Sequence, residues 1–140
     1  MPKQLQDKLH SVAFILPAPD ANLNSGNIAL GQSVDEFPDF EVGASFPPLN
    51  ATLLPDDETV TVTIQESQDG GSAWETIHAG VITGAGGKGA DTLTISCKPL
   101  NQKKVGSEIL TQLVYRVNVA ISDTAGAGIE DLPAVAHLTF

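Results

Sequence analysis

Thr59-Val-Thr-Val-Thr-Ile-Gln65 carries the strongest secondary-structure signal in the chain. Its valines and isoleucine fall on one side of an extended backbone and its threonines on the other, the period of two that a strand shows. Every residue except the last is branched at Cβ, which disfavours a helix. The segment therefore predicts a β-strand whose Val60, Val62 and Ile64 face the core.

The same alternation recurs in three later segments. We expect strands at 92–97, with Leu93, Ile95 and Cys97 facing in, at 112–121, and at 134–140. The inward residues of 112–121 are expected to be Leu113, Tyr115, Val117, Val119 and Ile121. Weaker candidates, separated by prolines and glycines, are 11–16, 27–30, 40–46, 50–54 and 74–78.

This pattern of about eight or nine short strands predicts an all-β fold, a jelly-roll-like or immunoglobulin-like two-sheet sandwich. Residues 11–140 are expected to form the single sandwich domain, and residues 1–10 an N-terminal arm. Within that arm, 4–10 is the best helical candidate and is equally compatible with an extended segment. The 140 residues are 41% hydrophobic, enough for a core without metal or disulfide support.

Charge and cysteine content narrow the classes of partner. Seventeen acidic residues against seven basic ones give a formal net charge of −10, which repels nucleic acid and anionic membrane surfaces. The apolar run 12–16 is too short to span a membrane. The single cysteine, Cys97, excludes an intrachain disulfide and is expected to be a buried strand residue rather than a nucleophile.

Ser67-Gln-Asp-Gly-Gly-Ser-Ala-Trp74 fits the Asp-box pattern Ser-x-Asp-x-Gly-x-Thr-Trp, with Ala73 in place of the usual threonine. The box residues are Ser67, Asp69, Gly71 and Trp74. Asp69 can accept hydrogen bonds from turn amides, and glycines at positions 70 and 71 can supply positive φ. The motif predicts a hairpin in which Trp74 packs inward; sugar binding through an exposed Trp74 is the alternative.

No motif indicates catalysis, so we expect no enzyme activity, no cofactor and no bound metal. The glycine-rich segment 84–89 lacks the Gly-Lys-Ser/Thr of a phosphate loop. The histidines His10, His78 and His137 are isolated in sequence, and His137 is expected at a surface or interface. Acidic clusters, for which solvated turns are expected and calcium binding is the alternative, occur at 35–41, 56–58 and 130–131.

Three stretches resemble the capsid cement, or decoration, proteins of tailed bacteriophages. They are Ser25-Gly-Asn-Ile-Ala-Leu-Gly31, the hairpin segment 62–77, and Leu113-Val-Tyr-Arg-Val-Asn-Val-Ala-Ile121 with the closing strand after it. The resemblance implies a structural virion protein that is made in the bacterial cytoplasm and coats the capsid exterior. It would bind over junctions of the major capsid protein and stabilise the phage head.

The resemblance also implies association with itself, as a homodimer or homotrimer, in which a face such as Thr59, Thr61 and Thr63 could serve. An apolar docking patch of Phe37, Phe40 and Phe46 is a further hypothesis, with core filling as its alternative. A tail, neck or baseplate accessory protein is the alternative location in the particle. A carbohydrate-binding module, with Trp74 and Tyr115 as exposed stacking platforms, is the alternative from a different class.

Overall fold

The computed structural model describes residues 10–29, 40–84, 89–90, 92–99, 113–122, 125 and 128–139. These residues form nine strands and a 3-10 turn, η2 (Ile129–Asp131). The strands are β1 (Ser11–Ile15), β2 (Asn22–Asn24), β3 (Ile28–Ala29), β4 (Glu41–Ser45), β5 (Thr59–Ser67), β6 (Glu75–Thr83), β7 (Thr94–Cys97), β8 (Val114–Ile121) and β9 (Pro133–Thr139). The predicted arm lies outside the described residues except for His10, which is buried.

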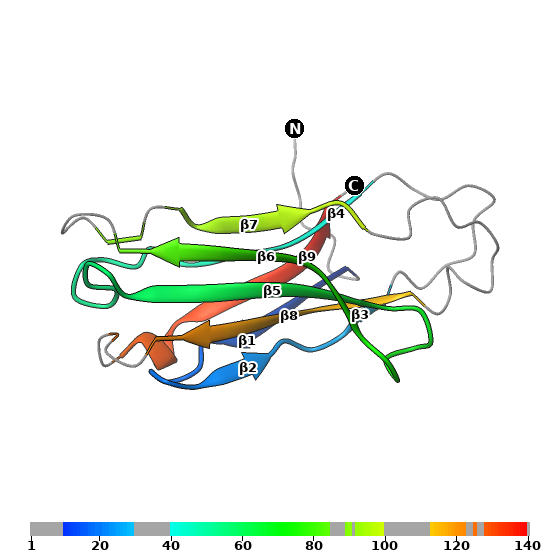
Figure 1. Cartoon of the computed structure of the whole chain (residues 1–140), viewed down its shortest axis with the longest axis horizontal. Helices are drawn as coiled ribbons and strands as arrows, with labels where there is room; N and C mark the ends of the chain where they lie inside the picture. Colours follow the sequence, from blue (N-terminus) through cyan, green and yellow to red (C-terminus); the bar gives the residue numbers. More distant parts are fainter. Residues whose placement is uncertain are drawn as a thin grey trace.

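The strands form two facing antiparallel sheets (Figure 1). Sheet A has the order β1-β9-β4-β7, and sheet B the order β2-β8-β5-β6, with β3 also paired to β8. The pairing is nested along the chain. β1 pairs with β9, β2 and β3 pair with β8, β4 pairs with β7, and β5 pairs with β6.

This nesting distinguishes the two predicted sandwich types. In an immunoglobulin-type sandwich the last strand shares a sheet with the strand before it. Here β9 lies between β1 and β4 in sheet A, whereas β8 lies in sheet B. Pairing from the outermost strands inward is the arrangement of a long hairpin rolled into two sheets, which is the jelly roll. The prediction of an all-β, two-sheet sandwich is therefore confirmed. Of the two predicted forms, the jelly roll matches the observed strand order.

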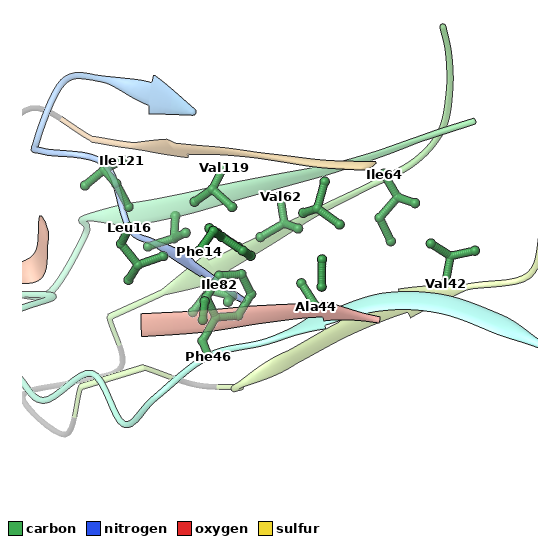
Figure 2. Close-up of a cluster of buried hydrophobic side chains, with 14 of the residues drawn as sticks. Phe14, Leu16, Val42, Ala44, Phe46, Val62, Ile64, Ile82, Val119 and Ile121 are labelled. Carbon is green, nitrogen blue, oxygen red and sulfur yellow. The ribbon is translucent and has the colours of Figure 1, made fainter. Parts of the chain in front are cut away.

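The core fills the space between the sheets with aliphatic side chains and a few aromatic rings (Figure 2). Val60, Val62 and Ile64 of β5 have no exposed surface, as their alternation predicts. The predicted inward residues of β8, and Leu113 just before it, are also buried. Phe14, Val42 and Ala44 of sheet A, with Leu16 and Phe46 directly after β1 and β4, fill the space opposite the inward residues of sheet B (Figure 2).

Three strand predictions were wrong in detail. Residues 50–54 form a turn because the Asn50 side-chain oxygen accepts hydrogen bonds from the Thr52 and Leu53 amides, at 2.9 and 3.0 Å. β7 begins at Thr94, so Leu93 precedes the strand and is 37% exposed instead of facing in. β2 was not predicted, because two of its three residues are asparagine, a residue depleted in strands.

β6 continues well beyond the predicted 74–78. A glycine at position 80 weakens the sequence signal for a strand, yet it matches the close packing at this position. A Cβ at Gly80 would lie 3.0 Å from two carbons of the Ile95 side chain. Gly80 thus permits β6 of sheet B to approach β7 of sheet A closely.

Replacing Ile64 by alanine tests the inward assignment of β5. Ile64→Ala is expected to lower the free energy of unfolding by about 2–5 kcal/mol, because it leaves a cavity between the sheets. The matched control, Thr63→Ala on the opposite side of the strand, is expected to cost less than about 1 kcal/mol. Urea denaturation of both variants measures the difference, and equal losses would contradict the assignment.

Candidate functional site

The Asp-box hairpin joins β5 to β6 and is organised by two side chains. The Ser67 hydroxyl accepts a hydrogen bond from the Gly71 amide at 2.9 Å and donates to Asp69 Oδ1 at 2.7 Å. Asp69 Oδ1 also accepts from the amides of Ser72 and Ala73, at 3.0 and 2.9 Å. These bonds satisfy the turn's backbone donors with side-chain oxygens, as the motif predicts.

Backbone conformation and charge explain the residue types in this loop. Gly70 and Gly71 have φ of 75° and 103°, values that other L-residues rarely adopt. A hydrogen bond from the Ala73 amide, and a further one from the Ser67 hydroxyl, lower the pKa of Asp69 below its ordinary value. The loop therefore holds an ionised Asp69 as its central acceptor at neutral pH.

Trp74 is half-buried at the start of β6, and its ring is held from two sides. Its indole Nε1 donates to the Gly71 carbonyl at 3.1 Å, and the Arg116 guanidinium carbon lies 4.1 Å from the ring centroid. Arg116 Nε also donates to Gln65 Oε1 at 2.7 Å. Arg116 was not predicted as a site residue, although alternation along β8 places it on the outer side of the sheet.

The proposed docking patch of phenylalanines is not an exposed surface. Phe40 is 1% exposed and Phe46 is 6% exposed, and both belong to the core between the sheets. Phe40 packs edge-on against Tyr115, with ring centroids 5.8 Å apart. The core-filling alternative therefore describes these two residues, while Phe37 lies outside the described residues.

Tyr115 and Glu66 form a polar pair within the sandwich. The Tyr115 hydroxyl donates to Glu66 Oε2 at 2.8 Å, and both residues are almost fully buried. Burial, and then the negative charge of Glu66, raise the pKa of Tyr115 well above its ordinary value. Tyr115 is therefore a core residue and cannot serve as an exposed stacking platform for a sugar.

Cys97 is half-buried at the end of β7. Burial raises the pKa of its thiol to about 11, and the carboxylates of Glu41 and Glu66 contribute in the same direction. The thiolate needed for nucleophilic attack is thus scarce at neutral pH. Cys97 therefore lies in a strand and packs against the core, as predicted, but it is half-buried rather than buried.

His137 was expected at the surface, but it is only 9% exposed on β9. Its Nε2 lies 3.0 Å from the Ser45 hydroxyl and its Nδ1 lies 3.1 Å from the Thr139 hydroxyl. Burial lowers the pKa of His137 below 6.5. The second nitrogen is bonded to a hydroxyl and not to a carboxylate, so the Ser45–His137 pair lacks the acidic group that completes a catalytic triad.

A shallow hollow of about 380 Å³ borders His137. Its lining residues are Phe40, Glu41, Thr94, Ser96, Lys98, His137 and Thr139. Glu41 Oε1 already accepts a hydrogen bond from the Ser96 hydroxyl at 3.1 Å. The lining of the hollow carries one carboxylate, Glu41, rather than the pair that glycoside hydrolysis uses.

The acidic clusters do not converge on a metal site within the described residues. In that part of the chain, no group of three histidine, cysteine, aspartate or glutamate side chains is arranged to hold an ion. Residues 56–58 lie in the turn before β5, and Glu58 Oε1 accepts a hydrogen bond from the Ser122 hydroxyl at 2.7 Å. Glu130 and Asp131 lie in η2, whereas residues 35–39 are outside the described ranges.

The fold and the hairpin together define the chain as a jelly-roll sandwich with an Asp-box turn. No family model matches the chain, and no curated protein matches it in sequence.

Across the described ranges, none of the helical segments has the length and apolar character required to cross a membrane.

Removing the Asp69 carboxylate tests its role in the hairpin. Asp69→Ala is expected to lower the melting temperature by a few degrees at neutral pH, because the amides of Ser72 and Ala73 lose their acceptor. The control Ser72→Ala should leave it unchanged, since the Ser72 bond to Asp69 uses only the backbone amide. Thermal denaturation followed by circular dichroism measures both variants.

The melting-temperature difference between wild type and Asp69→Ala is expected to depend on pH. The pKa of Asp69 is lowered in the folded state, so its contribution is present above the ordinary carboxyl pKa and is lost as pH falls through the lowered value. The difference in melting temperature between wild type and Asp69→Ala should therefore shrink in acid. A difference that grows as pH falls would contradict the assignment.

Tyr115 is the only tyrosine, so its ionisation can be followed by phenolate absorbance. Because folding raises its pKa, its contribution to stability is present below the ordinary value and is lost as pH rises above it. We expect phenolate to appear together with unfolding, followed by circular dichroism. In denaturant the same group should titrate at about pH 10, and equal titration in the folded protein would refute its burial.

Proposed function

We propose that this chain is a structural virion protein, a capsid cement or decoration protein of a tailed bacteriophage. In this function it binds over junctions of the major capsid protein on the capsid exterior and stabilises the phage head. The proposal starts from the three stretches that resemble such proteins. The jelly roll is compatible with it, since this fold recurs in viral capsid proteins, although the same fold also occurs in lectins.

The observation that carries the proposal is a nearly uncharged outer face on sheet B, which we call the neutral face. It consists of Asn22, Asn24, Thr59, Thr61, Thr63, Gln65, Thr76, Ala79, Val81, Thr83, Arg116, Asn118 and Ala120, placed on one side by strand register. Arg116 is the only charged residue in this set. In a chain with a net charge of −10, a surface without carboxylates suits contact with other proteins, whose interface cores are depleted in charge.

The carbohydrate-binding alternative has less support than assembly. It requires exposed aromatic rings, yet Tyr115 is buried and one side of Trp74 is occupied by Arg116. The neutral face spans four strands of sheet B, whereas small ligands bind in concave pockets. The tail, neck or baseplate alternative uses the same kind of contact and differs only in location.

Binding to capsids tests the proposed function. The purified chain is expected to sediment with empty capsids assembled from the major capsid protein of the same genome, and to raise their disassembly temperature. Binding that favours the assembled shell adds about 2.7 kcal/mol at a free concentration 100-fold above Kd. Bovine serum albumin at equal concentration controls for trapping. Failure to sediment with capsids, together with labelling of tails in whole particles, would favour the tail alternative.

A further inference from the structure

Arg116 is held in one position on the neutral face by two neighbouring side chains. Its guanidinium carbon lies 4.1 Å from the centroid of the Trp74 ring, and its Nε donates to Gln65 Oε1 at 2.7 Å. Gln65 lies directly opposite Arg116 in the pairing of β5 with β8. A guanidinium that is stacked and bonded in this way has already lost much of the rotamer freedom that binding would otherwise cost.

The two terminal nitrogens of Arg116 remain available to a partner. Within the described residues, its only hydrogen bond is the one from Nε to Gln65, and it forms no ion pair. Yet Asp69 and Glu75 lie close by in sequence to Trp74, in the same hairpin. Asp69 Oδ1 is instead occupied by a hydroxyl and two backbone amides of its own loop. The terminal N–H groups of Arg116 can therefore bind an external acceptor.

The surroundings of Arg116 favour a carboxylate as that acceptor. A planar guanidinium presents its N–H groups in a fork that matches the oxygens of a carboxylate or a phosphate. Arg116 is the only charged residue of the neutral face, whereas phosphate backbones are bound by several cations together. One guanidinium balances the charge of one carboxylate, so a single acidic side chain is the group that fits.

We propose that Arg116 is the anchor residue of the neutral face and binds an aspartate or glutamate side chain of the major capsid protein. This inference deepens the proposed function and rests on it, since it names the chemical group on the shell that the face recognises. Trp74 is a positioning residue in this arrangement, because it contacts the guanidinium and not the carboxylate. Arginine and tryptophan are also among the residue types that most often dominate the binding energy of protein interfaces.

The uncharged residues around Arg116 determine how strongly such a contact acts. A fully exposed ion pair contributes little, because water and salt screen it. A capsid subunit that covers the threonines and asparagines of this face would exclude water from the pair, and a desolvated pair is screened much less. A surface that lacks the carboxylate would leave the guanidinium buried without an acceptor, which costs free energy. Arg116 therefore selects between partner surfaces as well as binding the correct one.

Capsid binding by charge variants tests this assignment. Arg116→Gln removes the charge and keeps a polar side chain, and it is expected to weaken binding to empty capsids at least about thirtyfold in sedimentation assays. The matched control Lys98→Gln makes the same change in charge just after β7 in sheet A, and it should change the affinity less than about threefold. Arg116→Lys keeps the charge without the planar fork, so its affinity should lie between the two.

Zero-length cross-linking identifies the partner group. A carbodiimide joins an amine to a carboxylate in contact with it as an amide, with loss of water. The amine introduced by Arg116→Lys should therefore couple to an aspartate or glutamate of the capsid protein, which mass spectrometry locates. Wild type should give no cross-linked peptide from this position. Changing the located capsid residue to its amide should weaken wild-type binding about as much as Arg116→Gln does, with little further loss when both changes are combined.

The outcomes separate this inference from the cement function. If wild type and Arg116→Gln bind capsids equally well, the carboxylate contact is wrong while the cement function stands. Equal weakening by Lys98→Gln would also overturn the contact, because net charge would then explain the loss. If wild type does not bind capsids, the proposed function fails and the inference fails with it. Circular dichroism checks that each variant is folded; if Arg116→Gln is not, Arg116→Lys and its cross-link decide the question.

Discussion

The strip of apolar side chains that β5 and β8 present to the interior is the constraint on which the rest of the structure depends. These neighbouring strands of sheet B bury every inward residue from Val60 to Ile64 and from Val117 to Ile121. Because side chains alternate along a strand, the register that buries these residues also determines which residues of β5 and β8 lie on the outer face. The inward register thus places the threonines and asparagines of these strands on the outer, neutral face.

Alternation was sufficient to predict the central strands from sequence, since β-branched residues at every second position leave little freedom of interpretation. The Asp-box turn was equally accessible, because Ser67, Asp69 and Gly71 act on atoms only a few residues away. Weak strands were harder to predict in two situations. In one, a side-chain hydrogen bond competes with strand formation; in the other, packing against the facing sheet determines the residue type. Asn50 bonds to its own turn, and Gly80 is explained only by Ile95 on the facing sheet.

Long-range contacts account for what the sequence did not reveal about the candidate site. Phe40 and Phe46 stand among prolines, and a docking patch and core filling were both considered for them; burial between the sheets shows that they fill the core. His137 is enclosed through hydroxyls on β4 and β9. Arg116 lies over the ring of Trp74, which is forty-two positions earlier in the chain. Such relations appear only when the strands are placed side by side.

The position of β9 has a consequence for how the protein matures. This late strand lies between β1 and β4, so until it has been synthesised β1 lacks a hydrogen-bonding neighbour and β4 is paired on one side only, with β7. Closure of sheet A must therefore wait for translation of nearly all the described chain, and contacts so distant in sequence form slowly. During that interval the exposed edges of β1 and β4 could pair with another nascent chain, which makes dilute or chaperone-assisted synthesis favourable for correct folding.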